Sequence, residues 1–281
     1  SQSSEIIAIQ ACGQGFWRTI RPAIIFGFIV TLFGLFVNDV LAPAASYRYE
    51  KLFYQMVNNN PLPRIKQNLI LPDYEGGKLK NIIYAEKFDS DSLTFYNVSY
   101  FEYDNGKPKT TTQAEKMIWT DEAWYLEEGQ TINHGASTTT EITFSRSIQP
   151  VPTRYKPNDI IVIDKKPEQM GIRELKHHIN LYQGQGEKLR KLEIDWHQKI
   201  AIPFASIIFA LLGAALAVSS PRSGSARGFG LSIAIVFIYY VLLTLSSVLG
   251  EGGSLPPLLA AWTQNIIVGT WGIWLAIKRG R

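Results

Sequence analysis

Four apolar runs, each as long as a membrane-spanning helix, surround one polar block in this 281-residue chain. The runs are Pro22–Leu41, Ile200–Val218, Phe229–Gly250 and Leu258–Ile277. A helix needs about 20 apolar residues to cross ~30 Å of hydrocarbon. Three runs have no charged residue, and the first has only Asp39, which we expect at a membrane interface because a carboxylate deep in lipid is costly. The pattern predicts an integral membrane protein with an inserted extramembrane domain.

The charges predict how the chain is oriented. Residues 42–199 hold 21 basic and 21 acidic residues, so the whole net charge of +4 lies on the membrane flanks. Basic residues precede the first run, separate the second from the third, and follow the fourth, whereas the loop at 251–257 has none. By the positive-inside rule, both termini and the 219–228 loop are cytoplasmic, and residues 42–199 lie on the far side. This distribution gives no support to nucleic-acid binding.

The first part of the exported block predicts antiparallel strands. Short alternating segments, separated by turn signals, occur at Ile65–Leu71, Leu79–Phe88, Leu93–Tyr103, Thr110–Thr120, Ala123–Gly129 and Glu141–Ile148. Regular spacing without a helical period favours a sandwich or open barrel. Asp104-Asn105-Gly106 predicts a tight hairpin, and Glu127-Glu128-Gly129 predicts a turn. The single cysteine, Cys12, excludes a disulfide within the chain.

Apolar residues of these strands have two interpretations. Strict alternation places Phe95 on one face and Tyr96 and Val98 on the other. They form either an ordinary core or a groove for acyl chains, and the pattern does not separate the two. The candidate lipid-path residues are Phe95, Tyr96, Val98, Trp119, Trp124 and Phe144.

Two helices are expected outside the apolar runs. Residues 167–198 carry an amphipathic pattern that fits a membrane-surface helix or a plain connector. At the start, Ser3 or Ser4 caps a short helix with Glu5 in its first turn, and its apolar face could dock on a soluble partner. No nucleotide-binding loop, catalytic constellation or metal-ligand spacing occurs, so no cofactor or metal is expected.

Several of these stretches together resemble one family. Ser4-Glu5-Ile6-Ile7-Ala8-Ile9-Gln10-Ala11-Cys12-Gly13 is similar to the coupling helix of the LptF/LptG lipopolysaccharide-export permeases. Met170–Leu175, Lys199–Pro203, Gly228–Leu231, Tyr239-Tyr240 and Gly250–Trp262 resemble that family's later helices and loop. The resemblance covers essentially the whole chain.

The resemblance implies an α+β inner-membrane protein with a periplasmic antiparallel β-jellyroll. Two such permeases form a cavity that takes lipopolysaccharide, a cytoplasmic ABC ATPase dimer drives them, and the jellyroll passes acyl chains to a periplasmic bridge of the LptC/LptA type. The implied ATPase contacts are Ser4, Glu5, Ile6, Ile9 and Gly13. The implied cavity or gate residues are Phe237, Tyr239, Tyr240, Leu243 and Trp262. The family has six spans and four are visible here, so we expect an N-terminally incomplete chain.

The expected organisation has five parts. Residues 1–21 form the coupling helix, 22–41 a span, 42–166 the periplasmic β domain, 167–199 a connecting helix, and 200–281 three spans with a basic tail. Two alternatives stay open. One is a MacB/FtsX/LolE-type ABC permease, which should begin with a span and carry a mixed α/β domain; the other is a membrane receptor or scaffold that does not transport.

Overall fold

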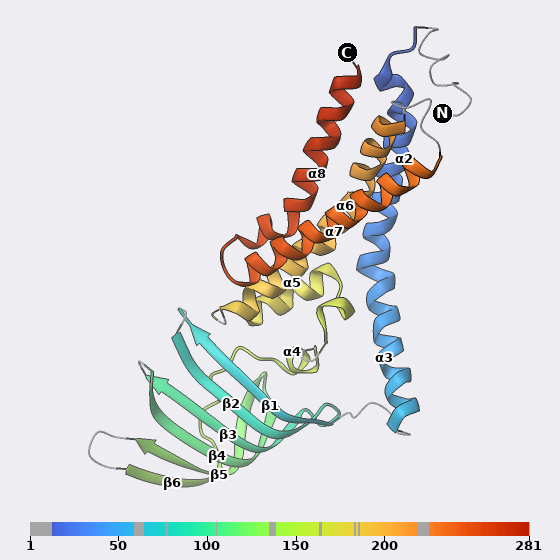
Figure 1. Ribbon diagram of the computed structural model, residues 1–281. Helices are drawn as coiled ribbons and strands as arrows, with labels where there is room; N and C mark the ends of the chain where they lie inside the picture. The colour runs from blue at the N-terminus through green and yellow to red at the C-terminus, as the bar shows by residue number, and fades with distance from the viewer. Residues whose placement is uncertain are drawn as a thin grey trace. The chain divides into compact units, whose positions relative to one another are not determined.

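The computed structural model describes residues 13–58, 65–76, 78–104, 106–134, 139–162, 165–182, 184, 186–217 and 225–280 (Figure 1). The chain divides into two compact units. The membrane unit comprises Ser1–Ala45, Pro167–Lys176 and Arg190–Arg281, and the β unit comprises Ser46–Lys166 and His177–Leu189. Each unit is described by itself below.

Long apolar helices build the membrane unit. They are α2 (Phe16–Phe36), the π-helical segment η1 (Val37–Leu41), the start of α3 (Ala42–Asn58), α6 (Glu187–Ala217), α7 (Ser225–Glu251) and α8 (Pro257–Gly280). By length and composition, Phe16–Glu50, Glu187–Ala217 and Gly228–Glu251 could each cross a membrane. The predicted fourth span is helical, as α8, but its crossing is not confirmed, because Gln264 and Asn265 make it more polar than the others.

Small residues allow these helices to approach closely. A Cβ added at Gly27 of α2 would lie 2.6 Å from the Cβ of Ala210 in α6, and one at Gly250 of α7 would lie 2.4 Å from the Cβ of Ala260 in α8. Helices in a bilayer associate largely through such close packing, since lipid tails are as apolar as the side chains. Both glycines are therefore required by the packing between neighbouring helices.

The first helix is longer than the sequence predicts. The apolar run ends at Leu41, yet η1 and α3 continue the helix to Asn58, 17 residues into the segment expected to begin the β domain. The sequence reasoning missed this because it assigned the end of the helix from the end of the apolar run. A π-helical turn contains one extra residue, and such turns are frequent at functional positions.

The β unit contains one six-stranded antiparallel sheet (Figure 1). Its strands are β1 (Ile65–Glu75), β2 (Lys78–Asp89), β3 (Thr94–Asp104), β4 (Lys107–Thr120), β5 (Ala123–His134) and β6 (Thr139–Arg146). All six predicted strands are confirmed, and so is the hairpin that joins β3 to β4. The described strands follow the order β1-β2-β3-β4-β5-β6. A jellyroll requires Greek-key neighbours, so that prediction is not confirmed.

A row of left-handed residues crosses this sheet. Asn68, Asn97 and Glu128 have φ angles of 54°, 51° and 52° on strands β1, β3 and β5. These three residues lie in one line across the sheet, which we call a rung. In all five strand pairings the residues of this rung are left out of the pairing register. The alternation of side chains is reset at this row, so residues three apart on one strand share a face.

Two sequence predictions fail at the row. Phe95 and Val98 were expected on opposite faces, but both are buried, with exposed fractions of 0% and 1%. Glu127-Glu128-Gly129 was expected to form a turn, but β5 runs straight through it to His134. The left-handed backbone of Glu128 shifts the alternation of side chains within the strand and does not reverse the chain.

Short helices follow the sheet. They are α4 (Pro157–Val162), the 3-10 turn η2 (Pro167–Gln169) and α5 (Ile172–Leu181). The single amphipathic helix expected over 167–198 is wrong, because Gly184 and Gly186 adopt φ angles of 93° and 53° and separate α5 from α6. A Cβ at Gly184 would also lie 2.6 Å from the Cβ of Tyr74, so this glycine serves both backbone and packing.

Candidate functional site

An irregular segment crosses the apolar face of the sheet in the β unit. This strap, residues 147–162, begins where β6 ends and includes α4. Val151, Tyr155 and Ile160 of the strap are buried. The Val151 amide donates to the Trp124 carbonyl at 2.8 Å, and the Trp124 indole donates to the Tyr155 carbonyl at 2.7 Å. The strap and the sheet thus enclose the apolar core between them.

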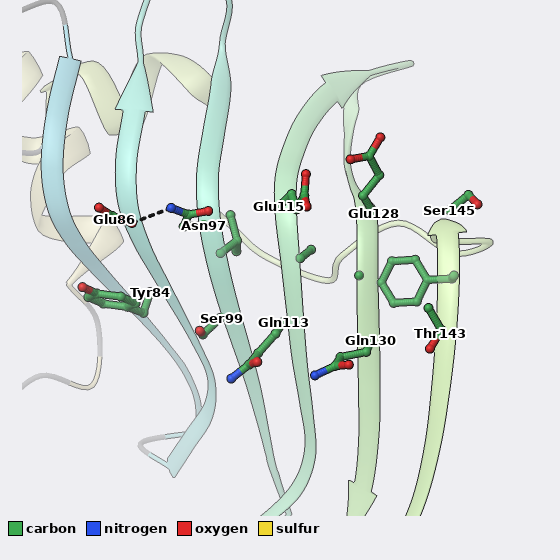
Figure 2. Close-up of a pocket in the computed structure, with 14 residues that line it drawn as sticks. Tyr84, Glu86, Asn97, Ser99, Gln113, Glu115, Glu128, Gln130, Thr143 and Ser145 are labelled. Atoms are coloured by element: carbon green, nitrogen blue, oxygen red, sulfur yellow. Dashed lines mark hydrogen bonds between the residues drawn. The ribbon is translucent and has the colours of Figure 1, made fainter.

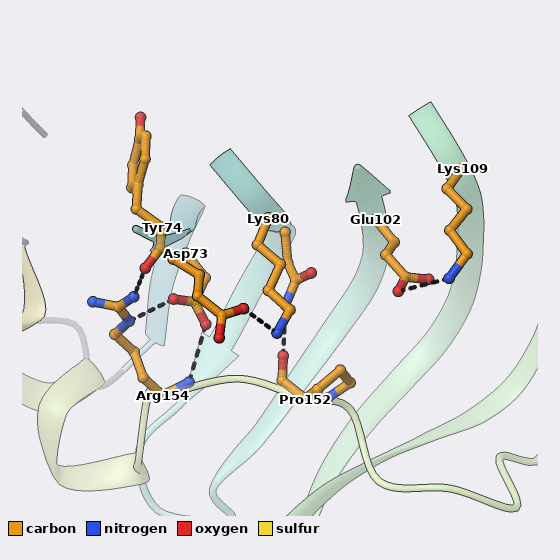
Figure 3. Close-up of polar contacts among 9 residues, drawn as sticks. Asp73, Tyr74, Lys80, Glu102, Lys109, Pro152 and Arg154 are labelled. Carbon is orange, nitrogen blue, oxygen red and sulfur yellow. Dashed lines mark hydrogen bonds and ion pairs between the residues drawn. The ribbon is translucent and has the colours of Figure 1, made fainter. Parts of the chain in front are cut away.

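Polar contacts at one end of the sheet hold the strap (Figure 3). The Arg154 guanidinium donates to the Asp73 carboxylate at 2.5 Å and also to the Tyr74 carbonyl. The Asn81 amide donates to the Pro152 carbonyl at 2.7 Å. The Tyr155 hydroxyl donates to the Pro72 carbonyl at 2.6 Å, and burial raises the pKa of this phenol, so it stays protonated as a donor. We call these contacts the latch.

The latch also covers one edge of the sheet. Proline has no amide hydrogen, so Pro72 on edge strand β1 offers only a carbonyl, and this carbonyl is occupied by Tyr155. The adjacent Tyr74 carbonyl is occupied by Arg154. Edge strands expose unpaired backbone groups that can recruit another strand. At this end of β1 two such groups are satisfied by side chains of the strap.

An aromatic cluster lies beneath the strap. The ring of Phe95 lies 4.6 Å from Phe88 and 5.0 Å from Trp124, and Trp124 lies 5.1 Å from Trp119. Phe95 and Trp124 are fully buried, whereas Trp119 is partly exposed. Trp119 lines a hollow of about 360 Å³ together with Leu93 and residues 156–158 of the strap. Three of the six predicted lipid-path residues therefore form one aromatic group that reaches the surface beside the strap.

The other three predicted lipid-path residues lie apart from that group. Tyr96 is partly exposed beneath the Lys87 ammonium, which lies 5.6 Å from its ring centre. Val98 is buried on the same face as Phe95, outside the ring contacts of that group, and together with Phe144 it borders a larger groove of about 670 Å³. The six residues therefore do not form one continuous surface in this structure.

Polar side chains from five strands line the larger groove (Figure 2). They form two rungs across the sheet, Tyr84, Ser99, Gln113, Gln130 and Thr143 in one and Glu86, Asn97, Glu115, Glu128 and Ser145 in the other. Hydrogen bonding to Glu128 and its negative charge raise the pKa of the Glu115 carboxyl. No Lys or Arg occurs among the lining residues. An acyl chain would desolvate these polar groups without replacing their hydrogen bonds, so the groove is unsuited to lipid tails.

The predicted cavity and gate residues occupy different surfaces of the membrane unit. Phe237 and Tyr240 are exposed on α7, with exposed fractions of 69% and 58%. Tyr239 is buried and donates to the Asn265 side chain at 2.9 Å, and Leu243 packs in the same cluster. Trp262 lies with its ring 5.5 Å from that of Phe204. These residues are thus divided between the exposed surface and the packed interior of the membrane unit.

Asp39 makes a contact that the sequence did not reveal. Its carboxylate accepts the Ile172 amide at 2.6 Å, at the first residue of α5, so η1 caps a helix more than 130 residues away. The neighbouring Asn38 side chain donates to the Lys199 carbonyl at 2.8 Å. A carboxylate at a helix N-terminus satisfies free amides and complements the helix dipole. The π-helical segment therefore ties the first span to α5 and α6.

Most of the predicted ATPase contact lies outside the described residues. Ser4, Glu5, Ile6 and Ile9 belong to the stretch before residue 13, and only Gly13 is described. Gly13 is exposed, has a φ of 87°, and has no atom near the position of a Cβ.

A comparison with models of known protein families identifies the family of the chain. A model described as lipopolysaccharide export system permease LptF/LptG matches residues 1–278. No curated protein matched the chain in a second comparison. The family match covers both units and agrees with a strand-rich unit inserted between apolar helices. The chain therefore belongs to the LptF/LptG family, and it is a lipopolysaccharide export permease of the inner membrane, a transporter subunit and not an enzyme.

Proposed function

We propose that this chain is one of two permease subunits of an ATP-driven exporter, and that its β unit takes the acyl chains of lipopolysaccharide onto the aromatic cluster beneath the strap. The observation that carries this proposal is that an apolar sheet face is covered by an irregular segment held at its end by polar contacts. A covering of this kind can open without breaking the hydrogen-bond ladders of the sheet.

The two hollows of the β unit differ in the ligand they suit. The aromatic cluster offers buried apolar surface, and each fully buried side chain contributes roughly 1.5–3 kcal/mol. The polar groove offers carboxylates and amides, which an acyl chain would desolvate without replacing their hydrogen bonds, and its carboxylates repel phosphates. Trp119 is the point of entry in this proposal, because it alone of the cluster is both partly exposed and adjacent to the strap.

Photo-crosslinking tests this proposal directly. A photoreactive residue at Trp119 or Phe95, in the complete transporter supplied with lipopolysaccharide and ATP, should label the lipid. The same residue at Gln113, in the polar groove, is the matched control and should give little label. Labelling at Gln113 with none at Trp119 or Phe95 would contradict the proposed path.

Energy for export comes from a cytoplasmic ABC ATPase dimer in this proposal. The contact is the segment that contains Ser4, Glu5, Ile6, Ile9 and Gly13, as the family resemblance implies. Glu5→Arg should abolish co-purification of the full-length permease with its ATPase and leave its membrane insertion unchanged. Retention of the ATPase by this variant would remove the coupling role and favour a scaffold without transport.

A second permease of the same family completes the lipid cavity. The exposed side chains of α7, including Phe237 and Tyr240, face either lipid or that second subunit, and Tyr239, Leu243 and Trp262 support them from inside the unit. In this arrangement both termini are cytoplasmic and residues 42–199 are periplasmic. Labelling of introduced cysteines at Ser254 and Gly13 from opposite sides of the membrane would test the orientation.

The far edge of the sheet is the proposed contact with a periplasmic bridge protein. Among the described strands, β6 pairs only with β5, whereas two carbonyls of β1 are already occupied by the strap. A strand of a bridge protein could therefore extend the sheet at β6. A crosslinker at Thr140 should capture that protein, and one at Ile70 on β1 should not.

A further inference from the structure

Two buried polar atoms of the β unit have no hydrogen-bond partner among the described residues. They are the hydroxyl oxygen of Tyr100 on β3 and the side-chain carbonyl oxygen of Asn81 on β2. The exposed fractions of these residues are 6% and 1%. A buried polar atom without a partner costs free energy, and nearly all such atoms in native proteins are paired. These two atoms therefore point to a partner that the chain itself does not supply.

The two residues, which we call the polar pair, are neighbours on the face of the sheet that the strap covers. Tyr100 is paired with Ile83, two residues along β2 from Asn81, so the polar pair is diagonal across the two strands. Diagonal residues on one face are within reach of each other when a side chain is long or aromatic. The Asn81 amide donates to the Pro152 carbonyl of the strap at 2.7 Å (Figure 3), which places the pair beneath the strap.

The covered face changes from apolar to polar along β3. Phe95 and Val98, at its beginning, have exposed fractions of 0% and 1% and offer hydrocarbon contacts. Tyr100 is paired with Thr112, and Thr112 with Thr131, whose hydroxyl lies 3.0 Å from the Thr112 hydroxyl. Hydroxyl groups thus cross three strands directly after the apolar residues. A ligand that is complementary to both regions has to be amphiphilic.

The charges around Tyr100 favour a neutral polar group over a phosphate. Burial raises the pKa of the Tyr100 phenol, and the negative charges of Glu102 and Asp73 raise it further, so the hydroxyl stays protonated and can donate. Lys109 lies 3.3 Å from Glu102, and Arg154 lies 2.5 Å from Asp73, so both neighbouring cations are already paired. A phosphate at Tyr100 would meet two carboxylates without a free cation.

A neutral lipid linkage supplies the missing contacts of the polar pair. The Tyr100 hydroxyl can donate to an ester or amide carbonyl, and the Asn81 carbonyl can accept from an amide N–H or a hydroxyl. Esters and amides join acyl chains to their headgroups. Tyr100 is five residues from Phe95, about 15 Å along the strand, which is a distance that an acyl chain can cover. Beyond Tyr100 the exposed Lys109 marks the edge of the covered face, where an attached headgroup has access to water.

We propose that Tyr100 and Asn81 bind the ester, amide or hydroxyl group at the polar end of an acyl chain whose hydrocarbon lies on the aromatic cluster. The inference rests on the proposed function and adds the direction of the chain, with its polar end at Tyr100 and its hydrocarbon end toward Phe95. The strap is bonded both to Trp124 and to Asn81, so its opening uncovers both regions and admits the chain sideways.

The test maps which atoms of the lipid lie against Tyr100. p-Azidophenylalanine, a photoreactive tyrosine analogue with an azide in place of the hydroxyl, is introduced at position 100 of the complete transporter, which receives purified lipopolysaccharide and ATP. Mass spectrometry of the labelled lipid should locate the label beside an ester, amide or hydroxyl group of the acyl chains. The matched control is the same analogue at Phe95, which should label methylene carbons of the chains.

A second arm distinguishes a lipid partner from a bound water molecule. Tyr100→Phe removes the unpartnered hydroxyl and keeps the ring, so the midpoint of thermal unfolding of the full-length protein should stay unchanged or rise. The same substitution should lower labelling of lipopolysaccharide from position 95 about fivefold, as expected for the loss of one hydrogen bond. Tyr155→Phe is the matched control for stability. Its hydroxyl is bonded to the Pro72 carbonyl, so its removal should lower the midpoint.

The outcomes separate this inference from the proposed function. Label from Phe95 or Trp119 with none from Tyr100 would overturn the polar subsite and leave the path beneath the strap standing. Label from Tyr100 on the hydrocarbon ends of the chains would overturn the proposed direction. A lower midpoint for Tyr100→Phe with unchanged lipid labelling would identify a bound water molecule as the partner and overturn the inference. No label from any of the three positions would overturn both proposals.

Discussion

The latch gives a quantitative prediction. Arg154→Met removes the guanidinium that bonds to Asp73 and to the Tyr74 carbonyl, and it leaves the Asp73 carboxylate with the Arg154 amide as its remaining donor. A hydrogen bond to a charged group contributes about 1.5–3 kcal/mol, and the pair is only partly buried, with side-chain exposed fractions of 27% and 12%. We therefore expect the strap to be destabilised by about 2 kcal/mol, a factor of roughly 30 in its opening equilibrium.

Hydrogen–deuterium exchange on the full-length protein in lipid nanodiscs measures this opening. The amide of Val151, bonded to the Trp124 carbonyl, should exchange about 30 times faster in the variant, because exchange in this regime follows the population of the open state. A double-mutant cycle with Asp73→Asn isolates the pairwise part of the effect.

A matched control is an ion pair close to the latch that does not involve the strap (Figure 3). Lys80 and Glu75 form an ion pair of the same length, 2.5 Å, but their side chains have exposed fractions of 46% and 72%. Lys80→Met should leave exchange at Val151 unchanged, since exposed pairs contribute little. If Arg154→Met accelerated exchange no more than Lys80→Met, the latch would have no role in holding the strap.

Three further predictions concern other contacts. Gly27→Ala should destabilise the membrane unit by about 1–3 kcal/mol through overpacking against α6, measured by thermal unfolding in detergent, whereas Gly213→Ala, which has open space, should not. Asn265→Leu removes two interhelical hydrogen bonds and should cost about 1 kcal/mol in the same assay; no loss would contradict the role of this network. Glu128→Gln should return the pKa of Glu115 toward its ordinary value in a carbon-13 carboxyl titration.

The raised pKa of Glu115 also predicts how the stability of the fold changes with pH. The folded state raises the pKa of the Glu115 carboxyl, so it holds its proton more tightly than the unfolded chain does. The contribution of this group to stability therefore falls as pH rises from the ordinary glutamate pKa through the raised one. Glu128→Gln should flatten this part of the stability profile. A persisting slope in the variant would assign the shift to another cause.

Local sequence signals predicted the secondary structure well. Each strand was visible because β-branched and aromatic residues alternate between turn residues, and the helices were visible because their apolar runs are long. The end of the first helix was missed because α3 is amphipathic. Charged residues such as Arg48 and Glu50 lie beside Tyr49, so the segment resembles the start of a soluble domain.

Long-range contacts could not be predicted from these signals. Asp73 and Arg154 are 81 residues apart, and nothing in either neighbourhood indicates that they meet. Phe95 and Val98 share a face only because the backbone of Asn97 is left-handed, which a pattern of strict alternation cannot express. The placement of the candidate lipid-path residues thus depends on a backbone feature, and their role in lipid binding stays a prediction.

The left-handed row has a consequence for how the sheet reaches its native pairing. Asn68, Asn97 and Glu128 meet the same skipped rung only when every hairpin is aligned correctly. A slip of one residue would separate the left-handed positions on neighbouring strands and also turn the apolar side chains toward water. The left-handed row therefore favours one register for all six strands. Misregistered or swapped sheets are less stable than the native sheet.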